Sequence, residues 1–201
     1  TGIRRQRQMC IRDRYNGGEG QDAVTFSQSK DNYSISKLGD DFIVTDASGS
    51  EGANTLTDME RVGFSDGILA LDVDAGETAG QAYRLYQAAF ARTPDMPGVA
   101  YHMNDMEANG LALWNIANNF LNSPEFKTQY GTNPSDDEYI NALYSNVLSR
   151  DASTAEVDWY KDQFDTGAMD KQAALIGFSE SPENVNLVSS EIENGIWLPE
   201  S

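Results

Sequence analysis

The sequence is poor in the residue types that most often carry chemistry or hold small folds together. Its 201 residues include one cysteine and one histidine, which excludes an internal disulfide framework and every metal motif built on two histidines. Basic residues are also scarce: 14 stand against 32 acidic residues, giving a formal net charge of -18. This charge argues against a nucleic-acid partner and against an anionic membrane surface. No apolar run approaches the roughly 20 residues that span a bilayer, so we expect no membrane insertion.

The positive charge that is present is concentrated at the N-terminus. Residues 1–14 carry five arginines, one aspartate and the only cysteine, Cys10. A basic arm or targeting segment is one interpretation, but a secretory signal needs an apolar stretch that this segment lacks. The string RRQRQMCIRDR instead resembles a translated sequencing adapter, and we interpret residues 1–14 as not native. Without them the chain has 9 basic and 31 acidic residues, a net charge of -22, and we expect native sequence to continue upstream.

The pattern of apolar residues changes near residue 75. In residues 15–75, apolar and polar side chains alternate and turn residues separate the runs, which is typical of strands. Strands are predicted at 23–26, 33–36, 42–45, 62–64 and 68–71, with hairpin turns at 39–41 and 65–67. Thr57 and Glu60 stand at capping-box spacing, which indicates one helical turn. We therefore expect a small β-rich unit over residues 15–75.

Residues 76–201 follow the helical period of 3.6 instead. Helices are predicted at 79–92, 96–109, 112–122, 124–130, 136–149, 154–166, 170–179 and 182–194. Ser135 and Ser153 each precede a glutamate at capping-box spacing, and Ser-Pro-Glu at 123–125 and 181–183 places proline at the first helical position. The predicted fold class is α+β: a β-rich N-terminal part is followed by an all-α module.

The helical module contains an internal repeat. Shifting the chain by 58 residues aligns 85–126 with 143–184 without a gap, and 8 of the 42 positions are identical. This predicts two similar four-helix units, at about 78–134 and 135–201.

Two residue types recur at corresponding places in these units. Arg92 corresponds to Arg150, and Glu125 corresponds to Glu183. We predict a structural ion pair in each unit, because the arginine fork binds a carboxylate at two points. The alternative is that both arginines cap helix C-termini. Residues 151–153 differ from 93–95, so a role of Asp95 is not expected to recur.

One glycine-rich segment points to a metal. Gly17–Thr25 fits the pattern G-G-x-G-x-D-x-U-x, the calcium-binding nonapeptide of RTX proteins. Calcium takes several hard oxygen ligands: the Asp22 carboxylate is one candidate, and the carbonyls of Gly18 and Gly20 are others. An ordinary glycine-rich turn before a strand is the alternative.

The resemblance extends beyond the nonapeptide. Residues 54–67, continuing into 69–72, look like the capping segment that follows RTX repeats in secreted bacterial proteins. The helical half, with its Tyr-x3-Phe-x-Arg-x-Pro-Asp pattern at 86–95, resembles a bacterial domain of unknown function that often follows RTX repeats and is distantly similar to phycobilisome linker domains. Together these similarities cover roughly residues 17–198. They imply a parallel β-roll with calcium shared between successive turns, and secretion by a type I route without cleavage.

No catalytic residue is predicted. Gly63–Gly67 matches the G-x-S-x-G of hydrolases, but a strand follows it where the hydrolase elbow requires a helix, and the only histidine, His102, falls in a predicted helix. We expect a non-enzymatic, calcium-associated C-terminal module that is secreted or at the cell surface and serves interaction, assembly or export-linked folding. One alternative is a helical module that binds a surface polysaccharide or a protein partner, which exposure of Tyr101, Trp114 and Trp159 on one face would favour. Another is an accessory domain of an enzyme whose catalytic part lies upstream.

Overall fold

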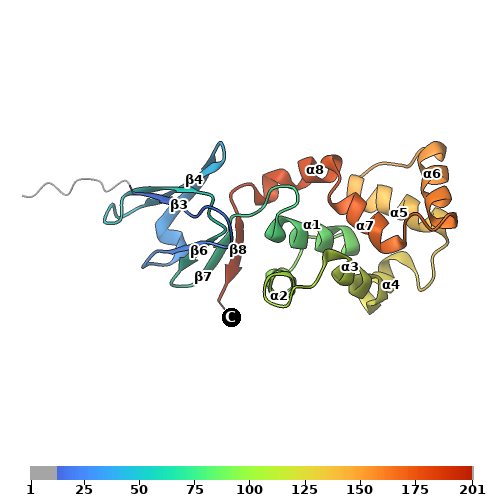
Figure 1. Ribbon diagram of the computed structural model, residues 1–201, viewed down its shortest axis with the longest axis horizontal. Helices are drawn as coiled ribbons and strands as arrows, with labels where there is room; N and C mark the ends of the chain where they lie inside the picture. Colours follow the sequence, from blue (N-terminus) through green and yellow to red (C-terminus); the bar gives the residue numbers. More distant parts are fainter. Residues whose placement is uncertain (1–12, 201) are drawn as a thin grey trace, which may run out of the picture. The chain divides into compact units, whose positions relative to one another are not determined.

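The computed structural model describes residues 13–200, whose elements fall into two compact units (Figure 1). One unit joins the described residues through Asp72 with the C-terminal segment from Glu193, and the other is Val73–Ile192. The first contains two four-stranded sheets, and the second contains the eight α-helices of the described chain. The predicted α+β class, with an all-α region after a β-rich part, is confirmed. Residues 1–12 of the segment interpreted as not native, Cys10 included, lie outside the described residues.

The two sheets of the first unit have the strand orders β1-β5-β4-β3 and β2-β6-β7-β8. Their strands are β1 (Arg14–Asn16), β2 (Ala23–Thr25), β3 (Tyr33–Leu38), β4 (Asp41–Asp46), β5 (Ala53–Thr57), β6 (Arg61–Phe64), β7 (Gly67–Ala70) and β8 (Ile196–Pro199), with a short 3-10 helix η1 (Lys30–Asn32) before β3. β1 runs parallel to β5 and β2 runs parallel to β6, whereas the other four described ladders are antiparallel. The chain therefore passes from the first sheet to the second in two parallel places, from β1 to β2 and from β5 to β6.

The core of this unit follows from the period-two pattern of its strands. Phe42 and Val44 alternate with more exposed neighbours along β4, so one face of the strand is buried. Rings from both sheets meet there: Tyr33 lies 5.2 Å from Phe26 and 5.2 Å from Phe64 between ring centroids. Two-residue loops close the predicted hairpins at 39–40 and 65–66, because Leu38 pairs with Asp41 and Phe64 with Gly67.

Three features of the first unit differ from the sequence prediction. The helical turn predicted at 57–60 is wrong, since Thr57 ends β5 and Asp58 adopts a positive φ of 49°. Arg14 was assigned to the segment interpreted as not native, but it lies in β1 and pairs with Thr55 of β5. The last predicted helix ends at Ile192, and β8 returns to pair with β7, so the C-terminal segment belongs to a sheet and not to the helical module.

The second unit is built from short helices whose ends lie close to the predicted ones. They are α1 (Thr78–Phe90), α2 (Met96–Glu107), α3 (Leu113–Asn122), α4 (Pro124–Tyr130), α5 (Asp136–Leu148), α6 (Thr154–Asp165), α7 (Lys171–Ser179) and α8 (Pro182–Ile192). The capping boxes at Ser135 and Ser153 both form. α1 and α3 of the first repeat pack against α7 of the second, and Phe90, Phe120 and Phe178 share one buried cluster. The two repeats are therefore halves of a single core.

Candidate functional site

The predicted calcium-binding turn connects the two sheets. Residues 17–22 run from β1 to β2, directly beside the turn 58–60 that runs from β5 to β6. The Gly17 amide donates to the Thr57 carbonyl over 3.1 Å, and the Asp22 carbonyl accepts the Arg61 amide over 3.0 Å. A Cβ on Gly17 would clash with the Asp58 carbonyl oxygen, so only glycine allows the two turns to stack this closely.

The predicted calcium ligands form only part of a cation site. Gly18 and Gly20 are exposed and have φ values of 87° and 121°, which strongly favour glycine. The Asp22 amide donates to Glu60 Oε2 over 2.6 Å, so one neighbouring carboxylate already serves the backbone. Between residues 13 and 200 there is no group of three or more histidine, cysteine or acidic side chains that could hold a metal ion. Because calcium takes six to eight oxygens, these residues do not make a complete cage.

The structure brings together both predicted arginine–glutamate pairs in the helical unit. Arg92 Nε lies 2.7 Å from Glu125 Oε1, and Arg150 Nε lies 2.8 Å from Glu183 Oε1. Each guanidinium also lies over a tyrosine ring, with 5.1 Å and 4.6 Å from its central carbon to the two ring centroids. In each repeat the arginine therefore ties the end of one helix to the start of another, from an exposed position where a single pair contributes about 0–1 kcal/mol.

The two repeats supply the second carboxylate of this cluster from different positions. In the first repeat Asp95, at the N-cap of α2, accepts the Tyr86 hydroxyl and lies 3.3 Å from Arg92. Ser153 takes the place of Asp95 in the second repeat, but Glu156, one turn further on, lies 3.0 Å from Arg150. The expectation that the role of Asp95 does not recur is wrong. In the second repeat a carboxylate also contacts the arginine, but it comes from the third position of α6 instead of from the N-cap.

Three large aromatic side chains of the helical unit are exposed to solvent. Tyr101 is 63% exposed, Trp159 is 51% exposed and Trp114 is 42% exposed. Tyr101 and Trp159 occupy corresponding positions of the repeat. Each meets the ring of the next residue nearly at right angles: Tyr101 meets His102 at 83° and Trp159 meets Tyr160 at 85°. Tyr101 and Trp159 thus expose apolar rings at matching places of the two repeats, whereas the Trp114 indole donates to Asp170 Oδ2 over 2.9 Å.

Trp159 stands at a hollow in the surface of the second repeat. The hollow has a volume of about 460 Å³ and is lined by Tyr144, Ala155, Glu156, Trp159 and Tyr160. Burial, together with the nearby charge of Glu156, raises the pKa of Tyr144 to about 12. Hydrogen bonds from Arg150 and then from Ser153 lower the pKa of Glu156 to about 2. At neutral pH the hollow therefore presents neutral phenols and one ionised carboxylate.

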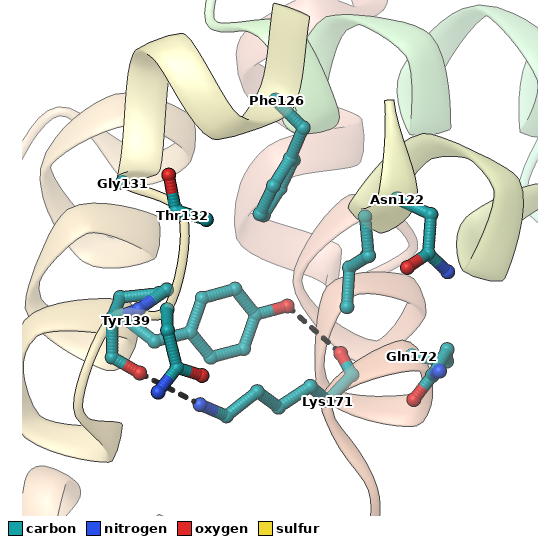
Figure 2. Close-up of a pocket in the computed structure, with 10 residues that line it drawn as sticks. Asn122, Phe126, Gly131, Thr132, Tyr139, Lys171 and Gln172 are labelled. Atoms are coloured by element: carbon teal, nitrogen blue, oxygen red, sulfur yellow. Dashed lines mark hydrogen bonds between the residues drawn. The ribbon is translucent and has the colours of Figure 1, made fainter. Parts of the chain in front are cut away.

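A second cavity, of about 280 Å³, lies where the two repeats join. Figure 2 shows Tyr139 and Lys171 spanning it, each bonded to a backbone carbonyl. The Tyr139 hydroxyl donates to the Lys171 carbonyl over 2.8 Å. Lys171 Nζ donates to the Pro134 carbonyl and lies 3.0 Å from Asp136 Oδ1. These bonds tie the connection between the repeats to α7, so the lysine is already neutralised and serves the packing.

Two largely buried ion pairs of the described residues were not predicted from the sequence: Arg61 with Asp72, and Arg84 with Glu180. Arg84, in the middle of α1, is 1% exposed, and Glu180 follows directly after α7. The guanidinium donates to both Glu180 carboxylate oxygens, over 2.7 Å and 2.8 Å, and to the carbonyls of Val73 and Asp74. The available signal was a charged residue within the apolar stripe of a predicted helix, but its partner lies 96 residues further along the chain.

The chain combines two units: one of two sheets that contain a parallel winding, and one helical unit of two related repeats. The family model described as "Domain of unknown function (DUF4214)" matches residues 117–188, from within α3 to within α8. This is similarity over part of the helical unit and less than half of the chain. No curated protein gives a significant match. Within the described residues, none of the helices combines the length and the apolar character needed to cross a membrane.

Proposed function

We propose that the chain is a non-enzymatic, calcium-associated C-terminal module of a secreted RTX-type protein. In this proposal the first unit closes a calcium-dependent β-roll, and the module serves interaction, assembly or export-linked folding. The observation that carries the proposal is the parallel pairing of β1 with β5 and of β2 with β6, because the nonapeptide turn lies within that winding.

The outer edges of this winding support the proposal. β1 and β2 are terminal strands of their sheets, and they follow each other along the chain. Unpaired strand edges readily accept a further strand, so an additional winding would extend both sheets at once. On the other side the sheets end in the antiparallel strands β3 and β8. A roll would therefore stop at this unit.

A further winding would also complete the calcium ligands. Its turn would stack on residues 17–22 as those residues stack on 58–60, adding carbonyl and carboxylate oxygens opposite Gly18, Gly20 and Asp22. The net charge of -18 opposes compaction, and a bound cation that requires the folded turns offsets this repulsion. With an extracellular-type Kd of about 10⁻⁴–10⁻³ M, the chain would stay loose at low calcium and fold after export.

The test compares two chains in thermal unfolding: the full chain, and residues 13–201, which keep β1 whole, preceded by two further G-G-x-G-x-D windings. For the extended chain, 10 mM calcium is expected to add about 1.4–2.7 kcal/mol of stability, as ligand in tenfold to hundredfold excess over Kd does. Magnesium at 10 mM is the control, because it prefers rigid octahedral sites that retain water. Asp22→Asn in the extended chain should reduce the calcium effect. The absence of any calcium stabilisation in the extended chain would refute the proposal.

The exposure of Tyr101 and Trp159 favours a second candidate function. The helical unit would bind a polysaccharide or a protein partner through these rings. Aromatic side chains offer apolar area at a small cost in conformational entropy, and they therefore dominate many recognition surfaces. This function is compatible with the first, because it uses the other unit.

A further inference from the structure

Trp159 and Tyr160 form two walls of the hollow in the second repeat. Their rings meet at 85° with centroids 4.8 Å apart, so they form a corner instead of a stacked pair. Tyr160 is held from behind by Phe178, whose ring lies parallel to within 26° at 5.3 Å. Trp159 keeps 51% of its surface exposed. The corner is thus fixed on its inner side and open on its outer side.

The polar groups at this corner suit a ligand that carries hydroxyl groups. Glu156 Oε2 already accepts bonds from Ser153 and Arg150, so Oε1, which lies 3.0 Å from Arg150 Nη2, is the oxygen that can accept a further hydrogen bond. Burial raises the pKa of Tyr160, so its hydroxyl is a neutral donor and acceptor. An apolar surface with a few convergent polar groups is typical of small-ligand sites.

Charge narrows the chemistry of the ligand. A chain with a net charge of -18 repels polyanions such as uronate polymers. Arg150 pairs with Glu183 at 2.8 Å as well as with Glu156 at 3.0 Å, so this cluster keeps one net negative charge and favours a ligand that donates hydrogen bonds over an anion. A neutral sugar ring fits best: one face of a pyranose is made of C–H groups, and its rim carries hydroxyls.

The first repeat provides an internal comparison. Tyr101 corresponds to Trp159, but Gly98 stands where the second repeat has Glu156. A Cβ at Gly98 would lie 2.7 Å from Tyr86 Cε2, so no side chain fits there. In the first repeat the carboxylate of the cluster therefore comes from Asp95, at the N-cap of α2, and not from the position that corresponds to Glu156.

We propose that the hollow lined by Glu156, Trp159 and Tyr160 binds one neutral hexopyranose residue of a polysaccharide. The C–H face of the sugar lies on the indole of Trp159, and its hydroxyls bond to Glu156 and to the Tyr160 hydroxyl. This rests on the polysaccharide-binding function of the helical unit and names its site and ligand class.

The test is native electrophoresis of the full chain in gels containing dextran, laminarin, amylose or galactomannan, with alginate as the acidic comparison. The wild-type chain should be retarded by at least one neutral polymer and not by alginate. Trp159→Ala should weaken that binding roughly tenfold, as expected for an aromatic anchor, and Trp159→Phe should retain most of it. Leu187→Ala is the matched control, because Leu187 is also 51% exposed but lies on α8. Circular dichroism checks that each variant is folded.

The outcomes separate the site from the general function. Failure of every neutral polymer to retard the wild-type chain would overturn both this site and polysaccharide binding by the helical unit. If binding is lost in Tyr101→Ala and kept in Trp159→Ala, polysaccharide binding stands but this hollow is not its site. If sedimentation velocity shows self-association that Trp159→Ala abolishes while no polymer binds, the occupant is a second copy of the chain and the proposal is overturned.

Discussion

The buried pair of Arg84 and Glu180 allows a prediction whose size follows from the structure. The Arg84 side chain is 1% exposed and that of Glu180 is 15% exposed. Gly80, one turn before Arg84, leaves the space that the guanidinium uses, since a Cβ there would lie 2.6 Å from Arg84 Nη1. Four hydrogen bonds hold the guanidinium, and they join α1 to the segment before it and to the end of α7.

Removing one partner should cost far more than removing both. Glu180→Gln keeps the shape but leaves the Arg84 charge buried without a counter-charge, which typically costs about 3–5 kcal/mol. The double variant Arg84→Met with Glu180→Met removes both charges, and such replacements are often neutral or stabilising. Two backbone carbonyls, of Val73 and Asp74, then lose their donor. We expect the double variant to be more stable than Glu180→Gln alone.

The assay is urea unfolding followed by circular dichroism at 222 nm. All described α-helices lie in the second unit, so the signal reports on that unit even where the two units unfold separately. A loss of 3–5 kcal/mol would be a large part of the roughly 5–15 kcal/mol that a domain has, and the midpoint should fall accordingly. Lys161→Met is the control: it removes an exposed ion pair with Asp137, worth about 0–1 kcal/mol.

Equal losses of stability in Glu180→Gln and Lys161→Met would show that the Arg84 charge does not need its buried partner, and the prediction would be refuted. It is also refuted if the double variant is clearly less stable than Glu180→Gln, because the pair would then contribute a net stabilisation larger than its desolvation cost.

Three further predictions concern Glu156 of the repeated cluster and the helical glycines Gly98 and Gly177. The pKa of Glu156 in the folded chain, about 2, lies below its usual value of 4.5. Its ionised form therefore contributes fully to stability above pH 4.5, and this contribution is lost as the pH falls toward 2. When the stability of the helical unit is measured from pH 7 to pH 2, Glu156→Gln should reduce the loss at low pH, and an unchanged loss would contradict this. In the same urea assay, Gly98→Ala should destabilise the helical unit by about 1–3 kcal/mol, because its Cβ would lie 2.7 Å from Tyr86 Cε2. Gly177→Ala has nothing within 4 Å of its Cβ and should stabilise α7 by up to about 1 kcal/mol.

The helices were predictable because their signals are local. Ser135 and Ser153 precede glutamates at the right spacing, and both capping boxes form. Pro124, at the first position of its helix, marks the start of α4. Such signals act within one turn of helix, so a single sequence reveals them.

The strands were harder because their pairing is not local. β5 has one large apolar residue, Leu56, among threonines, asparagine and alanine, and it is fixed by Arg14–Asn16 on one side and β4 on the other. β8 pairs with β7 across more than a hundred residues of helical sequence. Neither segment has an alternation strong enough to identify it without its partner.

The two arginine–glutamate pairs were predictable because the internal repeat contains the same residue types at the same positions in both of its copies. Arg92 with Glu125 and Arg150 with Glu183 recur at one spacing, and the structure brings each pair together. The move of the carboxylate from Asp95 to Glu156 was not predictable, because it depends on how two positions of a helix approach the same guanidinium in space.

Hydrogen exchange at the outer edges of β1 and β2 tests the central claim most directly. In the proposed roll both edges are docking positions for a further calcium-dependent winding. In the chain extended by two G-G-x-G-x-D windings, the backbone amides of β1 and β2 should become strongly protected when calcium is added, and protection should be lost with a chelator. Equal, fast exchange of these amides with and without calcium in the extended chain would contradict the account.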